Sequence, residues 1–206
     1  MNGLDTLIVA GSGQSNLALP DMFEARTRTT IRYADPSAWI TANAVACALS
    51  DFGDRLTTSQ QEVGMIVVSD RGPWAAMGET QAAASAGFSS PLRYAASNPG
   101  SLVAVACIAF GFRGPTLNLA MRPEDGVPVA LELSAGWLTR RSAQWMVLAT
   151  YTADSVETGL GRAVLLAPAT CAKNPGKFSI SSASQWLMRP GNTEKIHEEP
   201  SYTQAR

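Results

Sequence analysis

The residues of this chain that could carry out covalent chemistry are few and lie far apart in the sequence. Cysteine occurs at positions 47, 107 and 171, and the single histidine is His197. Cys47 and Cys107 lie among small apolar residues, a setting that is typical of buried thiols rather than of nucleophiles. Cys171 follows a predicted strand and has no base near it in the sequence. The cysteines show no CxxC spacing, so the sequence predicts neither a metal site nor a disulfide framework, and we expect no cofactor.

Carboxylates and hydroxyls are the remaining candidates for chemistry. Glu124 and Asp125 lie at the predicted start of a helix, where negative charge interacts favourably with the helix dipole; an acid-base role is the alternative. The segment Gly11-Ser12-Gly13 lacks the Gly-x-Ser-x-Gly order of a nucleophile elbow and the third glycine of a dinucleotide-binding loop. We interpret its glycines as turn residues. The acids beside His197 predict a solvated charge cluster rather than a catalytic histidine.

Apolar runs of strand length alternate with helical patterns along most of the chain. Asp35 and Pro36 provide an N-cap and a first-turn proline for a helix that ends at Gly53. The polar stretch 14–32 is predicted to be an irregular loop. Strands are predicted at residues 4–10, 62–69, 116–121, 144–151, 162–167 and 177–183, and further helices at 75–86, 101–112 and 125–139. This order predicts an α/β fold, with a mixed, mostly parallel sheet and helices on both faces.

Bulk composition excludes several classes of partner. The chain has 206 residues, of which 46% are hydrophobic, and its 16 Lys and Arg residues nearly balance its 17 Asp and Glu residues. Nothing therefore attracts it electrostatically to nucleic acid or to an anionic membrane. The apolar runs are shorter than the ~20 residues that a membrane span needs, and no signal pattern opens the chain. We expect a soluble protein of the cytoplasm.

Five segments carry a resemblance to a known family by their order and spacing. They are IVAGSG (8–13), RYADPSAWITANAVACALSDFG (32–53), EVGMIVVSDRG (62–72), SSPLRYAASNPGSLVAVACIAFGFRGPTLNL (89–119) and QWMVLATY (144–151). Together they resemble the N-terminal half of the β-ketoacyl-acyl-carrier-protein synthases, which belong to the thiolase-like superfamily. The resemblance implies a thiolase-like half as the fold, with a synthase-like domain at residues 1–187 and a polar tail at 188–206.

The resemblance also locates the position of the family's nucleophile. In the family, the strand after Gly114-Pro115 leads to a cysteine at the start of a buried helix. Aligned without gaps, this position is Pro123, with Glu124 or Asp125 as alternatives and Gly126 next to them. None of these residues can form a thioester. The family's two catalytic histidines come from its second half, which we expect this chain to lack.

A half scaffold implies a partner. We expect the apolar face of the helix around Val129, Leu133 and Trp137 to be open to water, and hence an obligate homodimer or a heteromer with a complete β-ketoacyl synthase. Acyl carrier protein is a further candidate partner. The leading hypothesis is a catalytically inactive subunit of a fatty-acid or polyketide system, comparable to a chain-length factor. The alternatives are an acyl-thioester-processing enzyme that uses Glu124, Asp125 or Cys171, and a structural homo-oligomer.

Overall fold

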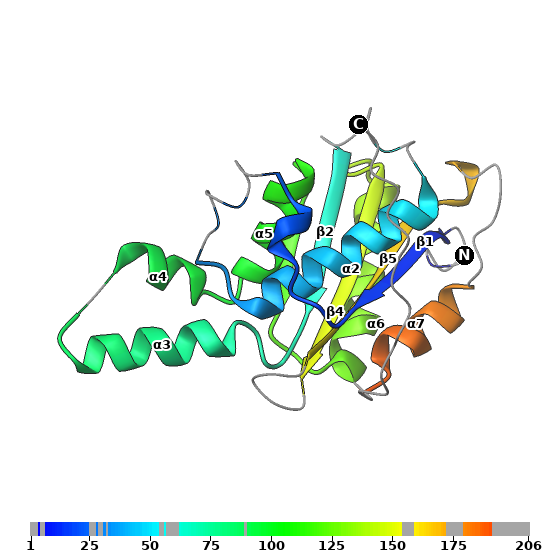
Figure 1. Ribbon diagram of the computed structural model, residues 1–206. Coiled ribbons are helices and arrows are strands. Elements are labelled where there is room, and N and C mark those ends of the chain that lie inside the picture. Colours follow the sequence, from blue (N-terminus) through cyan, green and yellow to red (C-terminus); the bar gives the residue numbers. More distant parts are fainter. Residues whose placement is uncertain are drawn as a thin grey trace.

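The computed structural model has three layers, in which a central β-sheet is covered by helices on both faces (Figure 1). It describes residue 4 and residues 7–24, 28, 31, 33–53, 56, 62–88, 90–153, 159–171 and 179–190. The strands are β1 (Leu7–Ser15), β2 (Val63–Val68), β3 (Thr116–Leu119), β4 (Trp145–Ala153) and β5 (Gly159–Pro168). The helices are α2 (Pro36–Phe52), α3 (Trp74–Ser85), α4 (Pro91–Ala96), α5 (Ser101–Phe110), α6 (Pro123–Thr139) and α7 (Ile180–Met188), with short 3-10 turns at Pro20–Met22 and Ala169–Cys171.

The five strands form one sheet in the order β1-β5-β4-β2-β3. β2 pairs in parallel with both β3 and β4, whereas β5 is antiparallel to both β4 and β1. Four strands therefore run in one direction and only β5 runs in the other. This confirms the prediction of a mixed, mostly parallel sheet, and it makes β3 and β1 the two edge strands.

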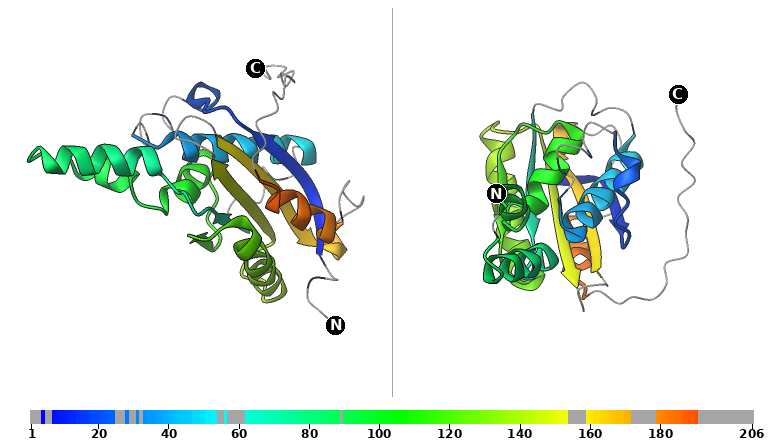
Figure 2. Two further views of the ribbon diagram at one scale, coloured as in Figure 1. Left: turned by 90° about the horizontal axis from the view of Figure 1, so that it is seen from below. Right: turned by 60° about the vertical axis from the view of Figure 1, so that its left-hand side comes forward.

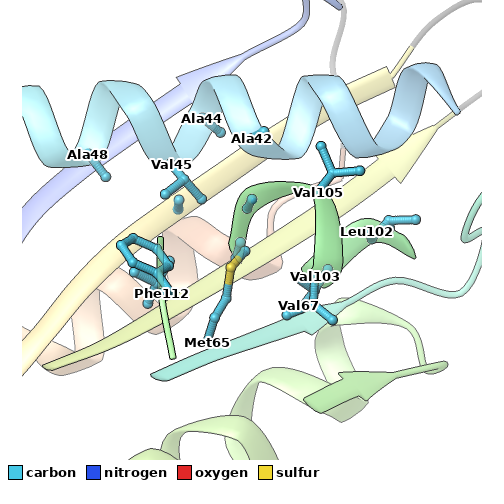
Figure 3. Packing of buried hydrophobic residues seen from close by; sticks show 14 of the residues in the cluster. Ala42, Ala44, Val45, Ala48, Met65, Val67, Leu102, Val103, Val105 and Phe112 are labelled. Carbon is cyan, nitrogen blue, oxygen red and sulfur yellow. The ribbon is translucent and has the colours of Figure 1, made fainter. Parts of the chain in front are cut away.

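Two apolar clusters fill the space between the sheet and its helices. Met65 and Val67 of β2 pack with α2 and α5 on one face, while Ile66 and Val68 pack with α6 and α7 on the other. Figure 3 shows the first cluster, in which Val45 of α2 lies over the sheet close to Phe112. A strand buried on both faces has a continuous apolar sequence, as the run 63–68 does. The predicted cover of helices on both faces is confirmed.

Asp35 joins the first turns of two helices. One carboxylate oxygen accepts hydrogen bonds from the backbone N–H and the hydroxyl of Ser37 at 2.8 and 2.6 Å, which caps α2 as predicted. The other oxygen accepts from the backbone N–H of Ala76 at 2.8 Å, in the first turn of α3. The carboxylate is buried, so its hydrogen bonds fix where α3 leaves the body of the protein.

The interpretation of Gly11 and Gly13 as turn residues is wrong. β1 continues through them to Ser15, and α2 packs directly against the strand at this point. A Cβ atom on Gly13 would overlap the backbone of Ala48 and the side chain of Cys47. Glycine is therefore needed here for the close approach of a helix and a strand.

Two further local predictions are corrected by the structure. Residues 180–188 form helix α7 and not a strand, because Ser179 caps its first turn by accepting a hydrogen bond from the N–H of Ser182 at 3.1 Å. The predicted loop before Asn98 contains helix α4, which Ser90 caps. Most of the predicted tail, residues 191–206, lies outside the described residues. No helix in the described ranges is long and apolar enough to cross a lipid bilayer.

Candidate functional site

The first turn of α6 lies at the carboxyl end of the parallel strands. β3 ends at Leu119, and α6 begins at Pro123 after the N-cap residue Arg122. The N–H groups of Asp125 and Gly126 donate to the Arg122 carbonyl at 3.1 and 2.9 Å. Pro123 is buried and occupies the first helical position, where its missing N–H leaves no helical hydrogen bond unmade. This is the position that the resemblance assigns to a nucleophile.

Glu124 and Asp125 are exposed on this first turn. A carboxylate oxygen of Asp125 accepts from Arg122 Nη2 and Nε at 3.2 and 3.3 Å, as part of an ion pair in which both side chains are more than half exposed. Such a pair contributes at most about 1 kcal/mol to stability. Both acids lie where the helix dipole favours negative charge. The geometry thus fits the helix-dipole interpretation of these carboxylates, although neither side chain caps the helix by a hydrogen bond.

Gly126 brings α6 close to the end of β2. The residue is buried, and a Cβ atom at this position would overlap Cγ1 of Val68 and lie 3.4 Å from Cβ of Met121. Any larger residue would push the first turn of the helix away from the sheet. Glycine thereby sets the position of Pro123 relative to β2.

The two cysteines with described side chains lie on helices of the opposite face of the sheet. Cys107 of α5 packs against the cluster formed by α2, α5 and the sheet, and burial raises the pKa of its thiol to about 11. Cys47 is half-buried on α2, beside Gly13. Neither thiol is on the α6 side of the sheet. The side chain of Cys171 and all of His197 lie outside the described residues, so their candidate roles stay predictions.

A small cavity of about 130 Å³ lies beside the carboxyl ends of β2 and β4. Its walls include Arg71, Trp74, Tyr151 and the buried Asp35. The guanidinium of Arg71 lies over the Trp74 ring at 4.9 Å. Burial, together with the negative charge of Asp35, raises the pKa of the Tyr151 phenol to about 12. The phenol is therefore protonated at neutral pH and can act as a hydrogen-bond donor, but not as a base.

The sequence analysis did not identify this cavity. Arg71 and Tyr151 come from separate segments, and each lies at or just after the carboxyl end of one of two neighbouring parallel strands. Ligands of open α/β sheets bind at such strand ends, which was the available signal. The cavity has room for only a few atoms. Its described walls provide the Tyr151 phenol as a hydrogen-bond donor and the Arg71 guanidinium as a cation, but they include no nucleophile.

The predicted interface residues of α6 differ in exposure. The side of the helix toward the sheet is buried and includes Val127, Leu131 and Leu138. Val129 is 43% exposed, whereas Leu133 and Trp137 are half-buried against the same cluster. The chain itself thus covers much of α6, and Val129 is the member of the predicted set that is clearly exposed.

The edge strand β3 is a second candidate interaction surface. It pairs with β2 on one side, and its outer edge has no strand partner in the described part of the chain. The side-chain oxygen of Asn118 on β3 is buried and accepts no hydrogen bond from the described residues. Ile108 of α5, a helix that contacts β3, is 46% exposed. An unpaired edge of this kind can pair with a strand of another chain.

Comparisons with known proteins identify the fold. No family model and no curated protein matches this chain. One matching chain comes from a structure of a type II PKS acyl-carrier protein in complex with its ketosynthase bound to the hexaketide. It has a TM-score of 0.65 and 14% identity, over 80% of this chain and 63% of that chain.

Two further matches also come from structures of ketosynthases. A chain from a ketosynthase in complex with its chain length factor, from Xenorhabdus doucetiae, has a TM-score of 0.56 and 14% identity, over 89% of this chain and 92% of that one. A β-ketoacyl synthase from Burkholderia phymatum STM815 has a TM-score of 0.58 and 12% identity, over 79% of this chain and 59% of that chain. This chain thus spans less than two thirds of the first and third of these matches. The predicted resemblance is confirmed at the level of the fold: the chain has the thiolase-like α/β fold of ketosynthases and chain length factors.

Proposed function

We propose that this chain is a catalytically silent ketosynthase-like subunit that acts together with an active β-ketoacyl synthase in fatty-acid or polyketide biosynthesis, in the manner of a chain-length factor. The observation that carries the proposal is the identity of the first residue of α6. A buried proline stands where the resemblance places a nucleophile. Proline has no group that could hold an acyl chain.

The chemistry of condensation explains why this residue matters. A thiol at a helix N-terminus has a lowered pKa, because the helix dipole stabilises the thiolate that attacks a thioester. The N-terminus of helix α6 is present here, but the sulfur atom that it would activate is not. Glu124 and Asp125 on the same turn are exposed, and Asp125 pairs with Arg122. They therefore lack the enclosed surroundings of a catalytic carboxylate.

The unpaired edge of β3 supports a protein partner. Its outer edge has no strand partner in the described part of the chain, and Ile108 of α5, a helix that contacts β3, is exposed. The ketosynthase–chain length factor complex favours a heteromer, because it contains a chain of about this length with this fold.

In such a heteromer the chain would stabilise the synthase and form part of the wall around its growing acyl product. The chain would thereby influence the length of that product without touching the reacting carbon atoms. Acyl carrier protein would then bind to the complex, as a partner of the active subunit.

Co-expression tests this proposal. The chain is produced with each β-ketoacyl synthase encoded near its gene, purified through a tag on the chain, and assayed with acyl- and malonyl-loaded carrier protein. We expect a stable complex that condenses, no condensation by the chain alone, and a product length that differs from that of the synthase alone. Failure of the chain to bind any of these synthases would refute the proposal.

Matched variants separate this function from an independent active site. Glu124→Gln and Asp125→Asn remove the two exposed carboxylates and are expected to leave the product yield of the complex within twofold. Substitution of the partner's nucleophilic cysteine by alanine is expected to abolish it. Thioester hydrolysis by the chain alone that is lost in either carboxylate variant would favour the enzyme alternative, and a stable homo-oligomer that ignores the synthases would favour the structural one.

A further inference from the structure

The cavity beside Asp35 and Tyr151 has no role in the proposed function. Tyr151 packs in the apolar cluster of α2 and α5, which places the cavity on that side of the sheet. The helix α6 that begins at Pro123 packs on the other side, and Figure 2 shows α2 and α6 on opposite faces of the sheet. The cavity is therefore separate from the position that the resemblance assigns to a nucleophile.

The cavity lies at a place where ligands bind in open α/β sheets. β2 has a parallel neighbour on each side, β3 and β4. The connection from β2 to β3 passes through α5 on one face of the sheet, whereas the connection from β3 to β4 is α6 on the other face. This change of face leaves a crevice outside the carboxyl ends of β2 and β4, where such sheets bind their ligands. Gly72 follows β2 and Ala153 ends β4, so the walls of the cavity come from both sides of this crevice.

The walls of the cavity are held in place by the protein itself. Asp35 is fixed by its hydrogen bonds to the first turns of α2 and α3. The hydroxyl of the buried Ser69 accepts hydrogen bonds from the backbone N–H groups of Arg71 and Gly72 at 3.3 and 3.1 Å. Gly72 has a φ of +59°, which glycine adopts without strain, so the loop after β2 turns here toward α3. A ligand would therefore meet a site that is already formed, which lowers the entropic cost of binding.

Three polar groups of the walls have no partner that matches their charge or hydrogen-bonding capacity. Asp35 is 4% exposed, and no ion pair joins it or Arg71 to another residue in the described ranges. Tyr151 is 5% exposed, and its phenol makes no hydrogen bond within the part of the chain that the structure describes. Buried polar groups of native proteins are normally paired, so these side chains indicate a ligand as their partner.

The charges and the size of the cavity restrict the kind of ligand. A simple anion would be repelled by Asp35 and a simple cation by Arg71, whereas a molecule that carries both charges can pair with both side chains. The volume of about 130 Å³ equals that of about four water molecules at ~30 Å³ each, which is room for a small organic molecule. We propose that the cavity binds a small zwitterion such as glycine or β-alanine, with its ammonium group on Asp35 and its carboxylate on Arg71 and the Tyr151 phenol. The methylene groups of such a ligand would lie against the apolar part of the wall, which includes Ala153.

NMR titration of the isotope-labelled full chain with glycine and with β-alanine tests the inference. At least one of the two is expected to cause saturable shifts of the signals of Tyr151 and of residues 69–75, with a dissociation constant on the order of 1 mM, because so small a ligand makes few contacts. Two molecules of similar size are matched controls. Glycolate carries a hydroxyl in place of the ammonium group of glycine, and ethanolamine carries a hydroxymethyl group in place of its carboxylate. Each control lacks one charge-assisted hydrogen bond and is expected to bind about tenfold more weakly or worse.

Matched variants locate the ligand in the cavity. Arg71→Gln and Tyr151→Phe remove the two donors for the carboxylate, and each is expected to weaken binding by about tenfold or more. The controls are Arg140→Gln and Tyr94→Phe, which make the same changes at exposed positions outside the cavity and are expected to leave the affinity within twofold. Because Arg71 is exposed, its variant keeps the test valid even where Tyr151→Phe lowers the stability of the chain.

The titrations decide between the possible ligands. Absence of saturable shifts with both amino acids would refute the site. Glycolate that binds as tightly as glycine would show that Asp35 takes no ammonium group, and ethanolamine that does so would show that Arg71 takes no carboxylate; either result overturns the zwitterion. An affinity that both Arg71→Gln and Tyr151→Phe leave unchanged would put the ligand elsewhere on the protein. The titration uses the chain without a synthase, so its result does not depend on the proposed heteromer.

Discussion

The contact of Gly126 with Val68 leads to a quantitative prediction about the position of α6. In a helix interior, alanine is favoured over glycine by about 1 kcal/mol. At position 126 the added methyl group would overlap Cγ1 of Val68, and a core overlap of this kind costs about 1–3 kcal/mol or more. We expect the substitution Gly126→Ala to lower the free energy of unfolding by about 1–2 kcal/mol.

A control exists in the same helix. A Cβ atom on Gly136 would meet only the guanidinium end of Arg140, at 3.3 Å, and this flexible group can move away. Gly136→Ala is therefore expected to raise the free energy of unfolding by about 0.5–1 kcal/mol. The free energies of unfolding of the two variants, measured by urea denaturation, should differ by about 2 kcal/mol. For a chain of this size this corresponds to a difference of roughly 4–8 °C in thermal midpoint.

A double-mutant cycle identifies the contact itself. Val68→Ala removes the atom that the new methyl group would overlap. The loss of free energy of unfolding caused by Gly126→Ala should therefore be smaller by about 1 kcal/mol or more in the Val68→Ala background than in wild type. Equal stability of the Gly126→Ala and Gly136→Ala variants, or a cycle without coupling, would mean that α6 does not begin against the end of β2. The assigned place of Pro123 would then be wrong.

Three other predictions follow from buried groups. Asp35→Ala should lower the free energy of unfolding, measured by chemical denaturation, by about 2 kcal/mol, because it removes the cap of α2 and the hydrogen bond to Ala76. Asp35→Asn should lower it by less. The pKa of Tyr151, raised from 10.0 to about 12, lies above that of the unfolded chain, so its stabilising contribution is complete below pH 10 and is lost toward pH 12. Tyr151→Phe should therefore lose less stability than wild type between pH 10 and 12, measured by denaturant titration at each pH. Cys107, with a pKa of about 11, should react with iodoacetamide at pH 8 only after unfolding, as judged by peptide mass spectrometry.

Much of the fold could be predicted because local signals and tertiary structure agree. The continuous apolar run of β2 indicated a strand covered on both faces, and Asp35 with Pro36 indicated where α2 begins. The layer order then follows from the alternation of strands and helices. These features depend on residues close together in the sequence.

The errors occurred where distant contacts decide the local structure. Gly11 and Gly13 indicate a turn when only their neighbours are considered, but the approach of α2 requires them within a strand. Ser179 and the spacing of Ile180, Ala183 and Leu187 did indicate a helix, although the β-like residues before them favoured a strand. Helix α4 has only six residues, which is too short for a hydrophobic period to reveal it in the sequence.

The strand and the helix on either side of Pro123 were predicted, but the surroundings of this position were not. The strand before Pro123 and the helix after it could be located from the sequence, as could the exposed acids. The cavity at Arg71 and Tyr151 could not, because its walls come from α3, from β4, from the loop after β2 and from Asp35 before α2, which meet only in the folded chain. The unpaired edge at Asn118 likewise depends on the strand order.

Intact-mass spectrometry of the co-purified complex tests the central claim most directly. The complex of this chain with its synthase is incubated with acyl-loaded carrier protein, and the mass of each subunit is measured. The account predicts one acyl group on the synthase and an unchanged mass for this chain. A stoichiometric acyl adduct on this chain would contradict it.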